Sequence, residues 1–98
     1  MVVSVAGATL LRGYVNFSHD GSGEAWLGYE ALNRNDNGSA QWWCEQAIKI
    51  EPTNADAWFN LGIAFGRLNK SELSAHAFGE AARLNPDRPE YRAAATTQ

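Results

Sequence analysis

The clearest hydrophobic pattern in the chain lies between residues 55 and 88. Apolar or small side chains recur there at helical spacing, first as Trp58, Leu61, Gly62 and Phe65, and then as Ser74, Phe78, Ala81 and Ala82. Side chains three and four positions apart share one face of an α-helix. The pattern therefore predicts two helices, near residues 55–68 and 72–84, joined by a turn at residues 69–71.

Gly62 indicates how these two helices meet. A glycine inside a helix costs about 1 kcal/mol relative to alanine, and its missing Cβ allows another backbone to come close. We therefore expect Gly62 to touch the second helix of the pair. The large residues of the stripe are expected to be buried around this contact, and they are Trp58, Leu61, Phe65 and Phe78.

A weaker copy of the pattern lies 34 residues earlier. Four features coincide at that offset: Leu27-Gly28 with Leu61-Gly62, Asn35 with Asn69, Ala47 with Ala81, and Pro52 with Pro86. We expect helices near residues 22–33 and 39–50. Because Ala31 and Cys44 replace the aromatic Phe65 and Phe78, the copy needs another core filler. Candidates are Trp26, Trp42 and Trp43.

The order of residues in 55–88, a large aromatic, Leu-Gly, an aromatic, a small residue, Phe, Ala and Pro, resembles the tetratricopeptide repeat. The resemblance implies an all-α fold, a solenoid of helical hairpins that stack into a right-handed superhelix. It divides a single domain, residues 1–98, into a segment of residues 1–20, full repeats at 21–54 and 55–88, and a truncated capping helix at 89–98. That last helix is expected to begin near residue 88.

The first 20 residues are open to more than one interpretation. Ala6, Leu10 and Gly13 stand two repeats before Ser74, Phe78 and Ala81, and their small, large, small order suits the second helix of a degenerate repeat. The alternatives are a capping helix with its own packing and, since Val2, Val3 and Val5 are β-branched, a β-prone segment.

Local signals mark the turns between helices. Ser39 is expected to cap the helix that follows the first turn, and Thr53 with Asp56 and Asp87 with Glu90 can form capping boxes. The stretch 33–38, Asn-Arg-Asn-Asp-Asn-Gly, imitates the start of a calcium loop. Its twelfth position holds Cys44 instead of the required glutamate, so we interpret the stretch as a helix-helix turn.

Charge and reactive residues narrow the function. The eight basic residues are dispersed and the net charge is −3, which argues against nucleic acid or an acidic membrane as partner. The single cysteine excludes an internal disulfide and a thiolate zinc site. Cys44 and His76 fall on different helices without a third catalytic group. We expect no enzyme activity, metal or cofactor, no signal peptide or membrane span, and a cytoplasmic location.

The family resemblance points to a binding surface. In tetratricopeptide proteins the first helices of the repeats line a concave groove for a peptide or a partner helix. The corresponding groove residues here are Trp26, Tyr29, Asn33, Phe59, Asn60, Ile63 and Arg67. Asn60 matches an asparagine of the carboxylate clamp found in some members, but Ala25, Tyr29, Glu90 and Ala94 stand where flanking cations are needed. We therefore expect an apolar or amphipathic ligand.

Two functions follow from this sequence. The first is a protein-interaction module that binds a peptide or helix in the groove. The second is a self-assembling scaffold unit that uses its end faces or Trp42 and Trp43. Neighbouring side chains on a helix point about 100° apart, so only one of these two indoles can face the core of its own repeat.

Overall fold

The computed structural model describes residues 20–97, and the interpretations of the N-terminal segment lie outside the described residues. Five α-helices occur in this range, namely α2 (Ser22–Asn33), α3 (Asn37–Ile50), α4 (Ala55–Arg67), α5 (Ser71–Leu84) and α6 (Pro89–Thr96). Residues 20–97 contain no β-strand. The prediction of an all-α chain is confirmed, and the helices begin and end close to the expected residues.

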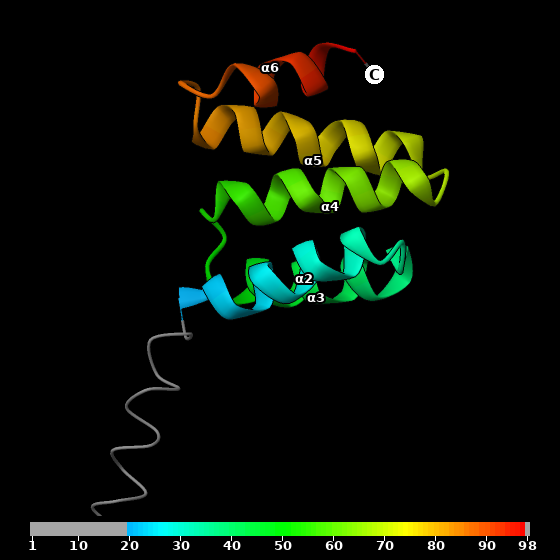
Figure 1. Cartoon of the computed structure of the whole chain (residues 1–98). Helices are drawn as coiled ribbons and strands as arrows, with labels where there is room; N and C mark the ends of the chain where they lie inside the picture. The colour runs from blue at the N-terminus through cyan, green and yellow to red at the C-terminus, as the bar shows by residue number, and fades with distance from the viewer. Residues whose placement is uncertain (1–19, 98) are drawn as a thin grey trace, which may run out of the picture.

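The helices form a stack in chain order (Figure 1). α2 packs against α3 and α4 against α5, which gives two helical hairpins, and α6 covers α5 at the end of the stack. The hairpins meet through α3 and α4, and α2 also touches α4. First helices α2 and α4 therefore lie near one another, as the offset of 34 residues predicts.

The turn inside each hairpin is built in the same way. Asn35 and Asn69 adopt left-handed backbone conformations, with φ of 61° and 64°. The N–H of Asp36 donates to the carbonyl of Ala31 at 2.9 Å, and the N–H of Lys70 donates to that of Phe65 at 2.8 Å. Asparagine tolerates this conformation better than most residues, and these bonds close the helix end as a Schellman motif.

The helix starts differ from the expected caps. α3 begins at Asn37, so Ser39 lies inside the helix, and the Asp36 carboxylate accepts the Ser39 N–H at 3.2 Å. α4 is capped by the side chain of Asn54, which accepts the Ala57 N–H at 3.1 Å. The expected capping residues Thr53 and Asp87 do not fill this role, because the Thr53 hydroxyl donates to Glu51 and α6 starts at Arg88-Pro89 without a side-chain cap.

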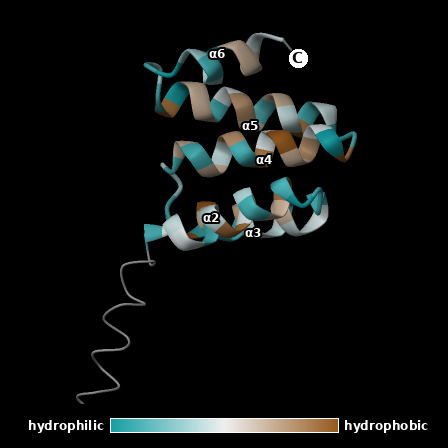
Figure 2. Ribbon diagram, viewed as in Figure 1, coloured by the Kyte–Doolittle hydropathy of each residue, from teal (hydrophilic) through white to brown (hydrophobic). Residues whose placement is uncertain are grey.

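The core of the second hairpin follows the predicted stripe. Leu61, Phe65 and Phe78 are buried, and a Cβ built on Gly62 would lie 2.6 Å from the Phe78 ring. The fully buried Ser74 hydroxyl donates to the Gly62 carbonyl at 2.7 Å, so side chains of α5 lie directly on the backbone of α4 at this point. Figure 2 shows hydrophobic and polar positions alternating along α4 and α5, as two half-buried helices require.

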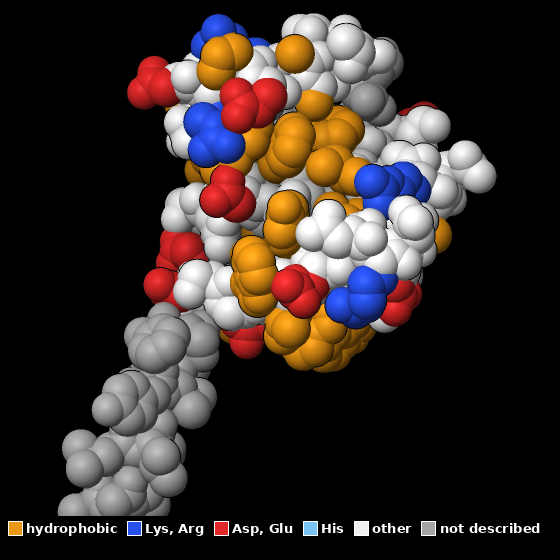
Figure 3. Space-filling model, viewed as in Figure 1, with side chains coloured by type: hydrophobic (Ala, Val, Ile, Leu, Met, Phe, Trp, Pro, Cys, Tyr) orange, Lys and Arg blue, Asp and Glu red, His pale blue; other side chains and the backbone are white. Residues whose placement is uncertain are grey.

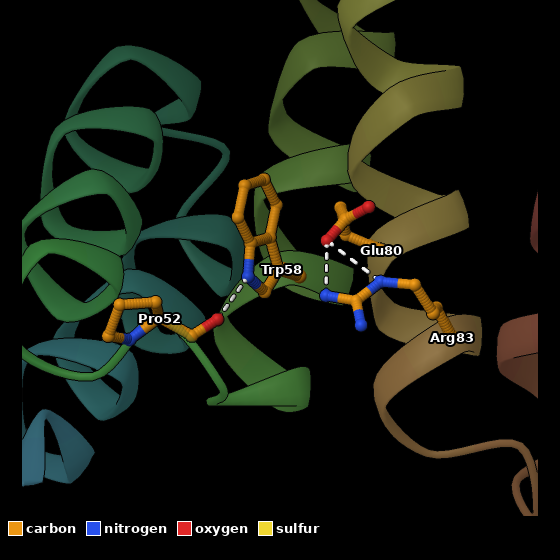
Figure 4. Close-up of polar contacts among 4 residues, drawn as sticks. All are labelled: Pro52, Trp58, Glu80 and Arg83. Carbon is orange, nitrogen blue, oxygen red and sulfur yellow. Dashed lines mark hydrogen bonds and ion pairs between the residues drawn. The ribbon is translucent and has the colours of Figure 1, made fainter.

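Trp58 was expected to be buried in the core. This prediction is wrong, because the side chain is only partly buried. Its indole N–H donates to the carbonyl of Pro52 at 2.8 Å. That bond holds the ring at the edge of the hairpin, between the loop before α4 and the Glu80–Arg83 ion pair on α5 (Figure 4). An indole combines a large apolar body with one polar N–H, and here the N–H has its partner at the surface.

In the first hairpin, α2 and α3 pack close together, and this compensates for the smaller core side chains. A Cβ on Gly28 would lie 2.6 Å from the sulfur of Cys44, so α2 and α3 meet without space for a filler. Trp26 and Trp42 are 56% and 53% exposed, which rules them out as core fillers, and Trp43 is partly buried. The two helices can pack this closely because Gly28, Ala31 and Cys44 have small side chains.

Candidate functional site

A pocket of about 470 Å³ lies where α2, α4 and α6 come together. Its lining is mostly aromatic and consists of Trp26, Tyr29, Asp56, Phe59, Asn60, Arg88 and Tyr91. We call this the groove pocket. Figure 3 shows hydrophobic side chains gathered over the middle of this face, with charged side chains at its edge.

One wall of the groove pocket comes from α2. Trp26 and Tyr29 stand three residues apart, so both rings project from the same side of the helix. Their centroids are 5.4 Å apart, and 56% of Trp26 and 44% of Tyr29 remain exposed. The buried face of α2 is formed by Ala25, Gly28, Ala31 and Leu32. The two aromatic rings therefore contribute little to the core and leave their surface for another molecule.

The opposite wall joins α4 to α6. Phe59 stacks on Tyr91, with ring centroids 4.7 Å apart and an interplanar angle of 27°. Tyr91 is 1% exposed, and its hydroxyl donates to the carboxylate of Asp56. Burial, followed by that hydrogen bond to Asp56, raises the pKa of Tyr91, so the phenol stays protonated. Tyr91 thus anchors the short α6 on α4 and fixes the shape of the groove pocket.

The charged groups of the groove pocket are Asp56 and Arg88. The Arg88 guanidinium lies 4.8 Å from the centroid of the Tyr91 ring and forms an ion pair with Glu90 at 2.9 Å. The hydrogen bond with Glu90 is the largest cause that raises the pKa of Arg88. Two carboxylates and one guanidinium therefore meet at this end of the groove.

The groove residues expected from the sequence fall into two groups. Trp26, Tyr29, Phe59 and Asn60 line the groove pocket, whereas Asn33, Ile63 and Arg67 do not. Ile63 packs against the core cluster of Ala31, Leu32, Ala40 and Ala64. Asn33 is exposed at the end of α2.

Arg67 has a structural contact as well as an exposed side chain. Its guanidinium donates to the carbonyl of Leu32 at 3.0 Å and to the side chain of Asn37 at 3.4 Å. These bonds tie the end of α4 to the turn of the first hairpin. An arginine held in this way is less available to a ligand than its exposure suggests.

Sequence reasoning missed Asp56, Arg88 and Tyr91. The signal for Tyr91 was present, because it is the single large aromatic residue in a short helix of otherwise small and polar residues. Asp56 and Tyr91 are 35 residues apart, so their hydrogen bond depends on how α6 crosses the stack. No local pattern in the sequence predicts how α6 is placed relative to the other helices.

A second apolar pocket, of about 510 Å³, lies between α3, α4 and α5. It is lined by Ile48, Trp58, Leu61, Phe65 and Leu73, with Glu45, Lys49 and His76 among its polar residues. Leu73 is 50% exposed, and the His76 ring contacts Trp58 edge-on at 5.7 Å. This pocket lacks the exposed aromatic pair that distinguishes the groove pocket.

Among residues 20–97, the potentially reactive Cys44 and His76 lie on different helices, α3 and α5. Cys44 is buried, and burial, followed by the charge of Glu45, raises its pKa to about 12, so the thiol is protonated at neutral pH. Among residues 20–97, no three His, Cys, Asp or Glu side chains converge in a way that could hold a metal ion. None of the helices in that range has the length and apolar character needed to cross a bilayer.

Comparison with known protein families agrees with the repeat pattern. Residues 43–74 match a family model described as a tetratricopeptide repeat. The match begins in α3, includes all of α4 and ends in α5, so it spans the junction between the two hairpins. The resemblance found in the sequence is thereby confirmed. No curated protein matches the chain.

Proposed function

Because residues 43–74 carry the tetratricopeptide repeat, we propose that this chain is a protein-interaction module that binds a peptide or a helix in the groove pocket. The observation that carries the proposal is the exposure of Trp26 and Tyr29 beside Phe59 and Asn60. The module has no catalytic role. Its partner is a protein segment with apolar side chains.

The physical argument rests on the cost of exposed aromatic surface. Contiguous apolar patches on a soluble chain usually mark sites of interaction. Tryptophan and tyrosine are also the residues that most often dominate binding energy, at about 2 kcal/mol or more per truncated anchor. Asn60 adds a donor and an acceptor among the rings, which suits the backbone amides of an extended ligand.

Selection of peptides tests this proposal directly. Peptides of 12 random residues are displayed, selected on the full chain and measured by fluorescence anisotropy. The Trp26→Ala, Tyr29→Ala double variant should lose at least tenfold in affinity, because two anchors are removed. Trp42→Ala is a matched control, since Trp42 is also about half exposed but lies on α3, outside the groove pocket. Equal affinity for the wild type and the double variant would refute the proposal.

Self-assembly is the second candidate, and one observation favours it. Leu61 is 4% exposed, whereas Leu27, its equivalent one repeat earlier, is 41% exposed. Trp42 and Trp43, which contact one another edge-on at 4.9 Å, lie on the other helix of that first hairpin. A second copy of the chain that covers Leu27, Trp42 and Trp43, at the end face formed by the first hairpin, would make a dimer. Residues 1–20 would cover this end face within one chain if they form a degenerate repeat, which is one of the interpretations that the sequence leaves open.

Light scattering separates these two outcomes. A dimer that becomes a monomer in the Leu27→Asp or Trp42→Ala variant supports assembly through the end face. A monomer at every concentration in the wild-type chain refutes assembly and leaves the groove as the interaction site. The same Trp42→Ala protein then serves both experiments.

A further inference from the structure

The groove pocket combines four aromatic rings with a carboxylate. Trp26, Tyr29, Phe59 and Tyr91 supply the rings, and Asp56 supplies the charge. The face of an aromatic ring is the negative end of its quadrupole, so it attracts a cation that lies over it. The rings and the carboxylate therefore both favour a positively charged ligand.

The chain already places a guanidinium on one of these rings. Arg88 lies 4.8 Å from the centroid of Tyr91. This contact shows that the aromatic wall accepts a planar cation within the range of a cation–π interaction, which extends to about 6 Å. Trp26 and Tyr29, on the other wall, are about half exposed and have no such cation among the described contacts.

Two carboxylates and one guanidinium lie at the groove pocket when Glu90, beside the lining, is counted with Asp56 and Arg88. Arg88 is paired with Glu90 at 2.9 Å, while Asp56 belongs to neither of the two ion pairs found within residues 20–97. One oxygen of Asp56 accepts the Tyr91 hydroxyl, and the residue as a whole is exposed. A carboxylate can accept several hydrogen bonds, so it retains capacity for a further donor.

We propose that the groove pocket binds the guanidinium group of an arginine side chain in the partner peptide, stacked on Trp26 and Tyr29 and paired with Asp56. This inference rests on the proposed function and adds the chemistry of the ligand. A volume of about 470 Å³ lies within the range of binding pockets and accommodates one long side chain with its backbone. Apolar residues on either side of the arginine would cover Phe59 and the rest of the groove.

The inference predicts selectivity by charge. Guanidinium donors match a carboxylate and also stack on indole rings, a combination that a neutral side chain offers only in part. An acidic segment would meet Asp56 and Glu90 at the groove pocket and would be repelled. The partner is therefore a basic, amphipathic segment.

Matched peptides test the charge. Fluorescent 12-residue amphipathic peptides carry arginine, citrulline or glutamate at one central position, and their affinities for the full chain are measured at low and at high salt. Citrulline has the shape of arginine without its charge. We expect the arginine peptide to bind about tenfold more tightly than the citrulline peptide, and the difference should shrink as salt is raised.

Two variants locate the effect. Asp56→Asn keeps an acceptor for the Tyr91 hydroxyl and removes the charge, so it should abolish most of the preference for arginine while citrulline binding is unchanged. Glu72→Gln, an equal loss of charge on α5 outside the groove pocket, should leave the preference intact. Trp26→Leu retains an apolar side chain at an exposed site and should also reduce the preference, which covers the case in which Asp56→Asn weakens folding.

The outcomes separate this inference from the function on which it rests. If the arginine and citrulline peptides bind with equal affinity, and both lose affinity in Trp26→Leu, the groove binds peptides but the charge assignment is wrong. If the preference persists in Asp56→Asn and in Trp26→Leu, the arginine binds elsewhere and the inference also fails. If none of the peptides, including those obtained by selection, depends on Trp26 or Tyr29, the proposed function itself fails.

Discussion

A methyl group added at Gly62 provides a sharp test of the packing described for the second hairpin. Gly62 lies within α4, where alanine is intrinsically the better helix former by about 1 kcal/mol. A substitution judged by helix propensity alone would therefore stabilise the protein. The structure predicts the opposite, because a Cβ at this position would lie 2.6 Å from two carbons of the Phe78 ring and 2.9 Å from a third.

The size of the effect follows from two opposing contributions. A contact of 2.6 Å forces the Phe78 ring or the α5 backbone to move, and Phe78 is 7% exposed, so it has little free space. Overpacking of this kind costs about 2–3 kcal/mol. The recovered helix propensity offsets about 1 kcal/mol. We expect the Gly62→Ala variant to lose about 1–2 kcal/mol in the free energy of unfolding, or about 5–10 °C in midpoint temperature.

The chain contains its own control for this experiment. Gly79 lies inside α5, and a Cβ there would meet no heavy atom within 4 Å. Gly79→Ala should therefore gain about 0.5–1 kcal/mol from helix propensity. Both variants are compared with the wild type by urea unfolding, which is monitored by circular dichroism at 222 nm (the usual helix signal). The changes in the free energy of unfolding should have opposite signs in the two variants.

A double variant assigns the cost to the proposed contact. With Phe78→Leu, which makes the neighbouring side chain smaller, the penalty of Gly62→Ala should become smaller, and the difference is the coupling between the two positions. A Gly62→Ala variant that is as stable as the wild type would refute the reasoning. So would an equal penalty with and without Phe78→Leu.

Three further predictions concern the core and one helix start. Phe78→Ala should lose about 3–5 kcal/mol of stability in urea unfolding, and an unchanged midpoint would show that the residue is not in the core. Cys44 should react with a thiol reagent only after unfolding, because burial raises its pKa to about 12; rapid labelling of the native chain would contradict this. The side chain of Ser39, followed by its backbone N–H, lowers the pKa of Asp36 below 3.8 in the folded chain, so its stabilising contribution exists above that pH and is lost as pH falls. Asp36→Asn, which keeps the cap, should differ from the wild type at pH 7 and converge with it near pH 2; a constant difference would exclude this titration.

The parts of the fold that local chemistry determines could be predicted from the sequence. The helical spacing of apolar residues predicted the helices. The presence of a glycine inside a helix, against helix propensity, predicted the close contact at Gly62. Asn35 and Asn69 indicated turns because asparagine accepts left-handed backbone, and both occupy that conformation. The sequence pointed to Thr53 as the cap of α4, whereas the structure uses Asn54, and a shift of one residue in the helix start decides between them.

The candidate site depended more on tertiary geometry. Trp26 and Tyr29 were recognisable, because α2 has other residues for its buried face. Asp56 and Tyr91 come together only because the Tyr91 side chain of α6 reaches α4, and no local pattern in the sequence between them indicates this contact. Arg67 looked like an available cation, but its guanidinium bonds to Leu32, which no pattern in the sequence indicates.

The indole N–H signals in a heteronuclear NMR titration test peptide binding in the groove most directly. The four tryptophans give four resolved reporters, of which Trp26 lies in the groove pocket, Trp42 and Trp43 lie on α3, and Trp58 is bonded to Pro52. On addition of a selected peptide, the account predicts a saturating shift of the Trp26 signal, with the signals of Trp42 and Trp58 almost unchanged. A shift of Trp42 or Trp58 with a stationary Trp26 would contradict the account and would move the binding site to α3 or to the second pocket, which Trp58 lines.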